Sequence, residues 1–292
     1  MVCVSVSDNL PHVERAPIHK RGGTMNQRKR AMFFIKYGPW AMVVGASKGI
    51  GAAFAEELAS RGLNLVLVAR NKKDLAVFSK YIHDKYRVQV LPRVLDLSRE
   101  TSSQALVREF GRRETGMLVY NAAASPTGEF LSLTSREHLK VLSTNCRGPL
   151  LSAIASGSLM KKRGRGGIIL MSSLAGMQGG PFAAHYSATK AYNMILAEGL
   201  WNELKPYKVD VLACIAGATD TPGYRVSLAG GKPRPGVPVM KAEKVVRIAL
   251  SALGRKPSVI TGFANRFFFF LLSRFTSRKS RVRFMAGAIK TK

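Results

Sequence analysis

A tyrosine and a lysine four residues apart are the side chains in this sequence best suited to proton transfer. They are Tyr186 and Lys190, in the segment Tyr-Ser-Ala-Thr-Lys. This spacing places both side chains on one face of a helix. A phenol with its ordinary pKa near 10 exchanges protons poorly at neutral pH, and a neighbouring ammonium lowers that pKa. The pair is a candidate acid–base unit, although the same spacing is common on helix surfaces that have no chemical role.

A serine at the end of a predicted strand could complete this unit. Ser173 follows the apolar segment 167–171. In open α/β sheets, ligands bind beyond the carboxyl ends of the strands. We therefore expect the Ser173 hydroxyl to hold a substrate oxygen beside Tyr186.

Three glycines form a second candidate site. Gly45, Gly49 and Gly51 lie between a predicted strand and a predicted helix. Glycines let the backbone turn sharply against a pyrophosphate, and the helix N-terminus adds free N–H groups and a positive dipole end. Such a trio is a weak signal alone, but at the start of a strand–helix series it predicts a dinucleotide site.

The residues after the second predicted strand indicate which dinucleotide binds. A carboxylate there would accept hydrogen bonds from the adenosine ribose and repel a 2′-phosphate. This sequence has Arg70 followed by Asn-Lys-Lys, and Lys48 lies within the glycine turn. We expect Lys48 and Arg70 to face the 2′-phosphate of NADP. A solvated helix start would have the same composition.

Short apolar strands alternate with longer helices through most of the chain. Strands are predicted over 41–44, 65–68, 88–95, 117–120, 167–171, 209–215 and 258–261. Helices are predicted over 50–61, 72–86, 98–112, 135–162, 183–204 and 241–253, the third of them with Ser98 at its N-cap. This order predicts an α/β fold, a doubly wound, Rossmann-like parallel sheet of about seven strands with helices on both faces.

The expected organisation is a single catalytic domain with an extension at each end. The domain covers 38–262, after a basic N-terminal tail over 1–37 that we expect to be disordered. Translation from Met25 would remove most of that tail. An apolar and then basic extension over 263–292 follows the domain, with one more helix as an option. The Pro- and Gly-rich segment 219–240 is expected to be a loop.

Composition excludes several classes of protein. The 292 residues include 46 Lys and Arg against 17 Asp and Glu, a net charge of +29 that attracts polyanions. No zinc-finger or helix-turn-helix pattern accompanies it, so specific nucleic-acid binding is not expected. Three cysteines (Cys3, Cys146, Cys214) match neither a disulfide framework nor a zinc site, so we expect reduced thiols and no metal. No apolar run is long enough to cross a bilayer as a helix.

Over residues 38–255 the chain resembles the short-chain dehydrogenase/reductase family. The motifs that carry the resemblance occur in the order found in that family. They are Gly45-x3-Gly49-x-Gly51, Asp96, Asn121-Ala-Ala, Asn145, Ser173, Tyr186-x3-Lys190 and Gly217-x3-Thr221. The resemblance implies hydride transfer between NADP(H) and a carbonyl or secondary alcohol carbon, with reduction the expected direction. It also implies a homodimer or homotetramer, paired through the helices that hold Asn145 and Tyr186.

The resemblance also implies a role for each matching residue. Tyr186 would be the acid–base, Lys190 would lower its pKa and bind the nicotinamide ribose, and Ser173 would position the carbonyl. Asn145 would support a water that relays protons through the lysine. Asp96 would meet the adenine, Asn121 the region of the adenosine ribose, and Thr221 the carboxamide. The other cofactor contacts expected are Ser47, Ile50, Leu97 and Gly217.

Three positions depart from the pattern of the family. Val44 replaces a common threonine, Tyr120-Asn-Ala-Ala123 replaces Asn-Asn-Ala-Gly, and Ala216 replaces a proline. All three touch cofactor packing, so they bear on affinity for the cofactor more than on proton transfer.

The substrate is indicated only by apolar residues near the site. Met177, Pro181, Phe182 and Leu228 favour a hydrophobic ketone, such as an acyl chain or steroid-like ring, and the loop 221–240 could cover it as a lid. The aromatic run at 267–272 could lie in a membrane interface, with the cations of 263–292 on anionic headgroups. We favour the alternative that it roofs the substrate pocket or is buried between subunits.

Three functions remain open from the sequence. The first is an NADP-dependent carbonyl reductase, and the second a catalytically silent NADP-binding regulator that recruits partners through the basic tail. The third, a nucleic-acid-binding protein, has only net charge in its favour. We expect a cytoplasmic protein, with peripheral membrane contact as an option.

Overall fold

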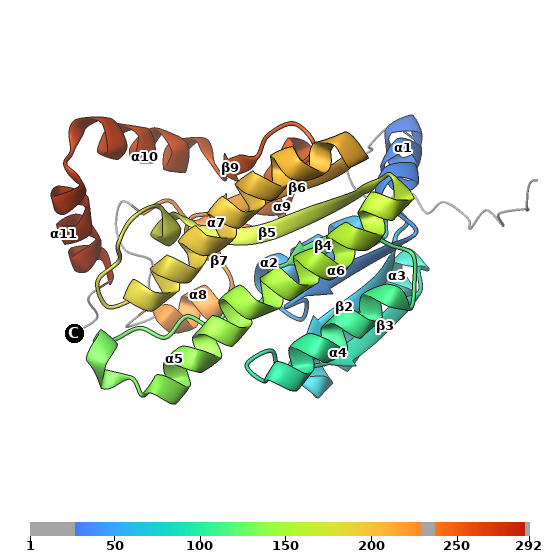
Figure 1. Ribbon diagram of the computed structural model, residues 1–292, viewed down its shortest axis with the longest axis horizontal. Helices are drawn as coiled ribbons and strands as arrows, with labels where there is room; N and C mark the ends of the chain where they lie inside the picture. Colours follow the sequence, from blue (N-terminus) through green and yellow to red (C-terminus); the bar gives the residue numbers. More distant parts are fainter. Residues whose placement is uncertain (1–26, 229–236, 290–292) are drawn as a thin grey trace, which may run out of the picture.

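The computed structural model describes residues 27–228 and 237–289. Seven strands form one parallel sheet in the order β3-β2-β1-β4-β5-β6-β9 (Figure 1). They are β1 (Trp40–Val44), β2 (Asn64–Ala69), β3 (Val90–Val94), β4 (Thr115–Tyr120), β5 (Gly166–Ser173), β6 (Val209–Ala216) and β9 (Ser258–Ile260). The predicted doubly wound, Rossmann-like architecture is confirmed.

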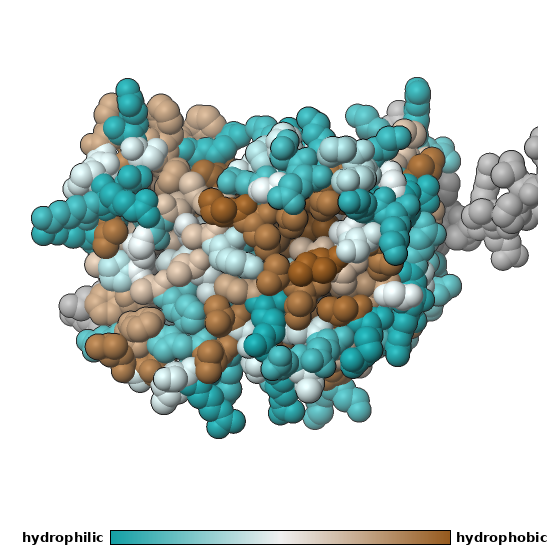
Figure 2. Space-filling model, viewed as in Figure 1, coloured by the Kyte–Doolittle hydropathy of each residue, from teal (hydrophilic) through white to brown (hydrophobic). Residues whose placement is uncertain are grey.

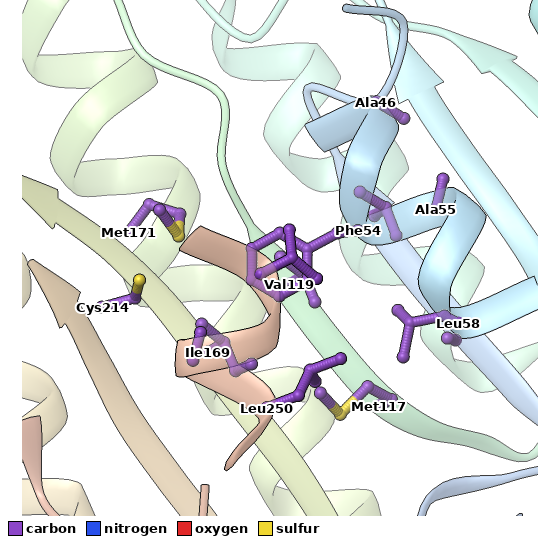
Figure 3. Close-up of a cluster of buried hydrophobic side chains, with 14 of the residues drawn as sticks. Ala46, Phe54, Ala55, Leu58, Met117, Val119, Ile169, Met171, Cys214 and Leu250 are labelled. Atoms are coloured by element: carbon purple, nitrogen blue, oxygen red, sulfur yellow. The ribbon is translucent and has the colours of Figure 1, made fainter. Parts of the chain in front are cut away.

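Helices cover both faces of the sheet. On one face are α2 (Gly49–Ser60), α3 (Lys72–Tyr86) and α9 (Ala242–Ala252), and on the other α4 (Glu100–Gly111), α6 (Gly148–Arg163) and α7 (Ala184–Leu204) (Figure 1). Successive strand residues face opposite sides, so Val43 packs in one apolar cluster and Val44 in the other. Figure 3 shows the first cluster, where Phe54 of α2 and Leu250 of α9 lie near Val119 of β4. Burial on both sides explains why the strands read as continuous apolar runs.

The topology gathers the predicted site residues at one edge of the sheet. Gly45, Asn121, Ser173 and Gly217 follow or end β1, β4, β5 and β6, which run in the same direction. The chain order reverses between β1 and β4, and such a switch point is where open α/β sheets bind ligands.

The N-terminal boundary differs from the prediction. Residues 27–37 are not a disordered tail but a helix, α1 (Gln27–Tyr37), whose last residue is 6% exposed. The Tyr37 hydroxyl donates to the Asp210 carboxylate, and the Lys36 ammonium pairs with the same carboxylate. These long-range contacts fix the helix to β6, which the local sequence does not reveal. Residues 1–26, with Cys3 and Met25, lie outside the described residues.

Two helix predictions also need correction. The helix α4 begins at Glu100 with Arg99 at its N-cap, because the Ser98 N–H donates to the Asp96 carboxylate at 3.1 Å and so belongs to the preceding turn. The single helix predicted over 135–162 is divided. It comprises α5 (Ser135–Leu142), a π-helical turn (Ser143–Arg147) and α6.

The segment 219–240 and the C-terminal extension contain more structure than predicted. Short strands β7 (Thr219–Asp220) and β8 (Met240–Lys241) pair, with α8 (Pro222–Ser227) after β7. Residues 229–236, including Gly230 and Gly231 of the expected lid, lie outside the described residues. The extension forms two helices, α10 (Phe263–Phe275) and α11 (Arg278–Ile289), because the backbone is extended at Thr276. Within 27–228 and 237–289, no helix combines the length and the apolar character needed to cross a membrane.

Candidate active site

Tyr186 and Lys190 both lie in the first two turns of α7. The Lys190 ammonium is 5.7 Å from the centroid of the Tyr186 ring and donates to the Met171 carbonyl of β5 at 3.0 Å. Lys190 is 3% exposed, and Tyr186 is partly buried. The lysine therefore occupies a fixed position between α7 and β5, beneath the phenol.

Ser173 meets this pair from the end of β5. Its Oγ accepts from the Ala175 N–H at 3.2 Å, and the residue is close enough to Tyr186 to act on the pKa of the phenol. The preceding residue, Ser172, donates from its Oγ to the Lys190 carbonyl at 2.7 Å. The structure thus brings Ser173, Tyr186 and Lys190 together as predicted. It also shows that Ser172, which the sequence analysis missed, holds the backbone of Lys190 against β5.

The electrostatics of the pair differ from the expectation. Burial raises the pKa of the Tyr186 phenol, and the hydrogen bond with Ser173 opposes that rise. Burial also lowers the pKa of Lys190 to about 8, opposed by Cys146. In the protein alone the phenol pKa is therefore raised and not lowered, because desolvation of the phenol outweighs stabilisation of its charged form.

Asn145 is fully buried in the π-helical turn, and its whole side chain is engaged. Its Nδ2 donates to the Ala124 carbonyl at 2.8 Å and to Thr189 Oγ1 at 2.9 Å, and its Oδ1 accepts from the Ala124 N–H at 2.8 Å. Thr189 is the residue before Lys190 and was missed by the sequence analysis. Asn145 therefore joins the loop after β4 to α7, and its side-chain amide binds protein groups.

Tyr120, one of the departures from the family pattern, supports the same turn. Its hydroxyl is buried and donates to the Thr144 carbonyl at 2.9 Å. A Cβ on Gly148 would collide with that hydroxyl and would lie 2.8 Å from Cζ of the ring. The position of the Tyr120 ring at the end of β4 therefore requires a glycine at position 148 in α6. The two residues are 28 positions apart, so no local sequence pattern indicates this contact.

The glycine turn is held by backbone geometry and by Asn121. Gly45 and Gly49 have φ of +83° and +60°, which other residues rarely adopt. The Asn121 Nδ2 donates to the Gly45 carbonyl at 2.9 Å, and a Cβ on Gly49 would lie 2.8 Å from Cγ2 of Thr221. The Val44 carbonyl accepts from the Asn121 N–H at 2.9 Å, so backbone bonds tie the turn where the family commonly has a threonine.

The residues around this turn fit a dinucleotide. The first turn of α2 has neither a side-chain cap nor an acidic residue, which leaves N–H donors for a phosphate. Asp96 lines a pocket of about 340 Å³ between the turn after β3 and the helix α5. Ser47 and Ile50 lie in and after the turn and are partly buried, whereas the Leu97 side chain packs in the core at 4% exposure.

The two predicted phosphate-binding cations differ in their surroundings. The Lys48 ammonium pairs with the Asp74 carboxylate of α3 at 2.7 Å, which the sequence analysis did not anticipate. Arg70 is exposed at the end of β2. Burial raises the pKa of Asp96, but hydrogen bonds from Ser98 and the charges of Arg70 and Arg99 hold it below its ordinary value.

A histidine pair beside Tyr186 was also missed. The Nδ1 atoms of His138 in α5 and His185 in α7 are 2.9 Å apart, and the Nε2 of His138 contacts the Phe130 carbonyl at 3.0 Å. Burial and the neighbouring His138 lower the pKa of His185. The pair connects the segment after β4 to the residue that precedes the phenol. The two histidines are 47 positions apart, so only the fold reveals it.

Two curated proteins with similar sequences are carbonyl or alcohol oxidoreductases. The chain is 33% identical to a 7β-hydroxysteroid dehydrogenase of Clostridium sardiniense over 235 residues, 79% of this chain and 88% of that protein. It is 31% identical to a very-long-chain 3-oxoacyl-CoA reductase of Podospora anserina over 225 residues, 75% of this chain and 64% of that protein.

Solved structures and a family model complete the comparison. A 7β-hydroxysteroid dehydrogenase structure matches with a TM-score of 0.79 at 25% identity, covering 87% of this chain and 98% of that one. A short-chain dehydrogenase from Sphingobium yanoikuyae in complex with NADPH matches with a TM-score of 0.71 at 28% identity, covering 82% and 97%. The model of the family described as short chain dehydrogenase matches residues 39–230. The match to this family model over most of the chain, together with these relatives, shows that the chain belongs to the short-chain dehydrogenase/reductase family.

Proposed function

We propose that this protein is an NADP(H)-dependent oxidoreductase that reduces the carbonyl of a hydrophobic, lipid-derived ketone to a secondary alcohol. A carbonyl/alcohol oxidoreductase is the class to which its relatives belong. The observation that carries the proposal is that the fold brings Ser173, the Tyr186 phenol and the buried ammonium of Lys190 together, with the ammonium 5.7 Å from the centroid of the phenol ring. This unit lies at the carboxyl edge of the sheet, where a bound nicotinamide and a ketone can meet.

In this mechanism the residues of the chain orient the ketone and supply a proton. NADPH, when bound, supplies the hydride to the carbonyl carbon. The Tyr186 phenol gives its proton to the carbonyl oxygen, while the Ser173 hydroxyl donates a hydrogen bond to the same oxygen. The Lys190 ammonium stabilises the phenolate that forms. A phenol that is fully protonated at neutral pH, as burial ensures here, suits an acid in reduction.

Two further residues would hold this unit in place. Asn145 binds the residue next to Lys190, and Tyr120 binds the turn that contains Asn145. Gly45, within the glycine turn, and Thr221, whose side chain lies against Gly49 of that turn, would meet the cofactor. In the family, a water beside Asn145 relays protons to and from Lys190. Because the Asn145 side chain here binds Ala124 and Thr189, that water would be held by the backbone of the π-helical turn.

The substrate class rests on the apolar segment between the catalytic residues. Met177, Pro181 and Phe182 are partly buried in the connection from Ser173 to Tyr186. The Phe182 carbonyl accepts from the Gly128 N–H at 2.8 Å, which closes this segment against the loop after β4. The steroid and long-chain oxoacyl substrates named for the two relatives support a hydrophobic ketone.

A direct assay tests the function. The purified full chain is mixed with NADPH and a panel of ketones that includes 3-oxoacyl thioesters and steroid ketones, and loss of NADPH absorbance is followed. We expect Tyr186→Phe to lower kcat by roughly 10³-fold, while Tyr192→Phe on the same helix leaves it unchanged. Equal rates for Tyr186→Phe and wild type would overturn the mechanism. NADPH binding without turnover of any ketone would favour the catalytically silent regulator.

The preference for NADP is tested at Arg70. The exposed guanidinium at the end of β2 and the NADPH complex of the Sphingobium yanoikuyae relative support it. Arg70→Asp should raise KM for NADPH at least about tenfold while KM for NADH falls or stays constant. Arg108→Asp, on the remote helix α4, is the control. An unchanged ratio of the two KM values would reject NADP as the preferred cofactor.

A homodimer or homotetramer through α6 and α7 is part of the proposal. Apolar residues gather over these helices in Figure 2, around a groove of about 220 Å³ lined by Leu150, Ile154, Leu196, Leu200 and Leu204 among others. Ile154 and Ile195 are 57% and 61% exposed. Sedimentation should show an oligomer for wild type and a smaller species for Ile154→Glu with Ile195→Glu.

A further inference from the structure

The outward face of α10 is made of phenylalanines. Phe263, Phe267, Phe270, Leu271 and Phe275 follow helical spacing and are 37–74% exposed, and Asn265 is the one residue of this helix that is buried. Figure 1 shows α10 on the outside of the molecule, with α11 at an angle to it. Phe268 turns toward α11, where its ring centroid is 5.8 Å from that of Phe284. An aromatic stripe of this kind ordinarily packs inward, so here it requires a partner.

Cations surround this stripe, and no acidic residue accompanies them. From Phe263 to the end of the chain the sequence has eight Lys and Arg and no Asp or Glu. Arg266 and Arg274 lie on α10 beside the phenylalanines, and Arg278, Lys279 and Arg283 are exposed on α11. Aromatic residues beside cations match the interface of an anionic bilayer, where rings enter the headgroup region and cations meet phosphate and carboxylate groups.

The same two helices lie beside the candidate active site. The buried Asn265 fits against Gly217, because a Cβ on Gly217 would lie 2.9 Å from the Asn265 side-chain carbon Cγ. On α11, Val282 packs near Gly179, in the connection between Ser173 and Tyr186. A bilayer on the outer face of α10 would therefore be close to the segment between Ser173 and Tyr186, where the proposed ketone would bind.

We propose that α10 and α11 form a docking surface for an anionic phospholipid bilayer, with the phenylalanine stripe inserted at the interface and the basic residues on its headgroups. The stripe does not roof the substrate pocket, because Phe263, Phe267 and Phe270 are 53–74% exposed on the outside of the fold. The docking surface itself needs no catalysis. The benefit of collecting a lipid-derived ketone there rests on the proposed function.

Vesicle sedimentation with the full chain tests this proposal. One set of vesicles contains phosphatidylcholine alone, and the other contains phosphatidylcholine with phosphatidylserine. We expect binding to the anionic vesicles that weakens as salt is raised. Phe267→Ser with Phe270→Ser should weaken it by roughly tenfold for each ring removed. Arg278→Gln with Lys279→Gln should weaken it about thirtyfold, at about 1 kcal/mol per cation.

Matched variants separate this surface from general stickiness and from catalysis. Val77→Ser on α3, where the valine is 73% exposed, and Arg108→Gln on α4 should bind vesicles like wild type. Tyr186→Phe should bind like wild type too, so failure of the proposed function would leave this result intact. Unchanged thermal melting verifies folding of each variant.

The proposal is overturned if the wild-type protein does not bind anionic vesicles, or if the double phenylalanine variant binds them as tightly as wild type. It is also overturned if that variant merely dissociates an oligomer, which would make the stripe a subunit interface.

Discussion

The Lys190 ammonium, buried under α7, donates its hydrogen bond to the Met171 carbonyl at 3.0 Å and not to the phenol four residues earlier. Met171 lies near the end of β5, two residues before Ser173. The strand that presents the serine therefore also fixes the lysine, and α7 carries the tyrosine between them. Catalytic geometry in this protein depends on the packing of one helix against one strand.

Burying the charged Lys190 ammonium with a single carbonyl partner, that of Met171, lowers the free energy of unfolding when the lysine is protonated. Its pKa falls from 10.5 in the unfolded chain to about 8 in the folded protein. Between these two pH values the unfolded chain holds a proton that the folded protein has released, so the free energy of unfolding rises with pH. We expect wild type to gain up to about 3 kcal/mol over this range relative to Lys190→Met. Urea denaturation at several pH values measures the difference, and parallel curves for the two proteins would contradict the assignment.

The Ser173 hydroxyl should tune the phenol as well as hold the substrate. Because its hydrogen bond opposes the rise in the pKa of Tyr186, Ser173→Ala should raise that pKa further. Reduction requires the protonated phenol and alcohol oxidation the phenolate, so the pH dependence of both reactions should move to higher pH. We also expect kcat to fall by roughly 10²-fold. Thr101→Ala, exposed on α4, is the control. A lower kcat with an unmoved pH profile would leave Ser173 with a role in binding alone.

Tyr120 and Gly148 should behave as a coupled pair. Gly148→Ala places a methyl group against the Tyr120 hydroxyl and should lower the free energy of unfolding by about 1–3 kcal/mol. In a Tyr120→Phe background the same change should cost less, because the oxygen that it meets is gone. A double-mutant cycle by urea denaturation measures this coupling. Additive effects of the two substitutions would show that the contact is relieved elsewhere.

Asn145 should contribute more to stability than an ordinary amide. Asn145→Ala leaves the Ala124 N–H and carbonyl without their partner, and we expect a loss of about 2–4 kcal/mol. Asn202→Ala, on the exposed end of α7, should change stability by less than about 0.5 kcal/mol. Thermal or urea unfolding compares the two variants. Equal effects would mean that the loop after β4 repacks around the gap.

The sequence by itself determined the architecture and the identity of the main site residues. Apolar runs of strand length between longer helices predict a parallel sheet covered on both faces, and such a sheet brings all strand ends to one edge. Glycines that need positive φ, and a phenol one helical turn from an ammonium, are properties of short segments. Gly45, Ser173, Tyr186 and Lys190 could be singled out for this reason.

Only the tertiary structure decided how those residues are held and how they titrate. Lys190 bonds Met171, Asn145 bonds Ala124 and Thr189, and His138 meets His185, each across 19 to 47 positions. Burial raised the pKa of Tyr186 where the local pattern predicted the reverse, since desolvation depends on everything packed around a group. The helix at 27–37 and the outward direction of the α10 phenylalanines could not be predicted for the same reason, because both depend on packing against distant parts of the chain. Sequence spacing fixes which residues share an element, but only packing decides what each side chain faces.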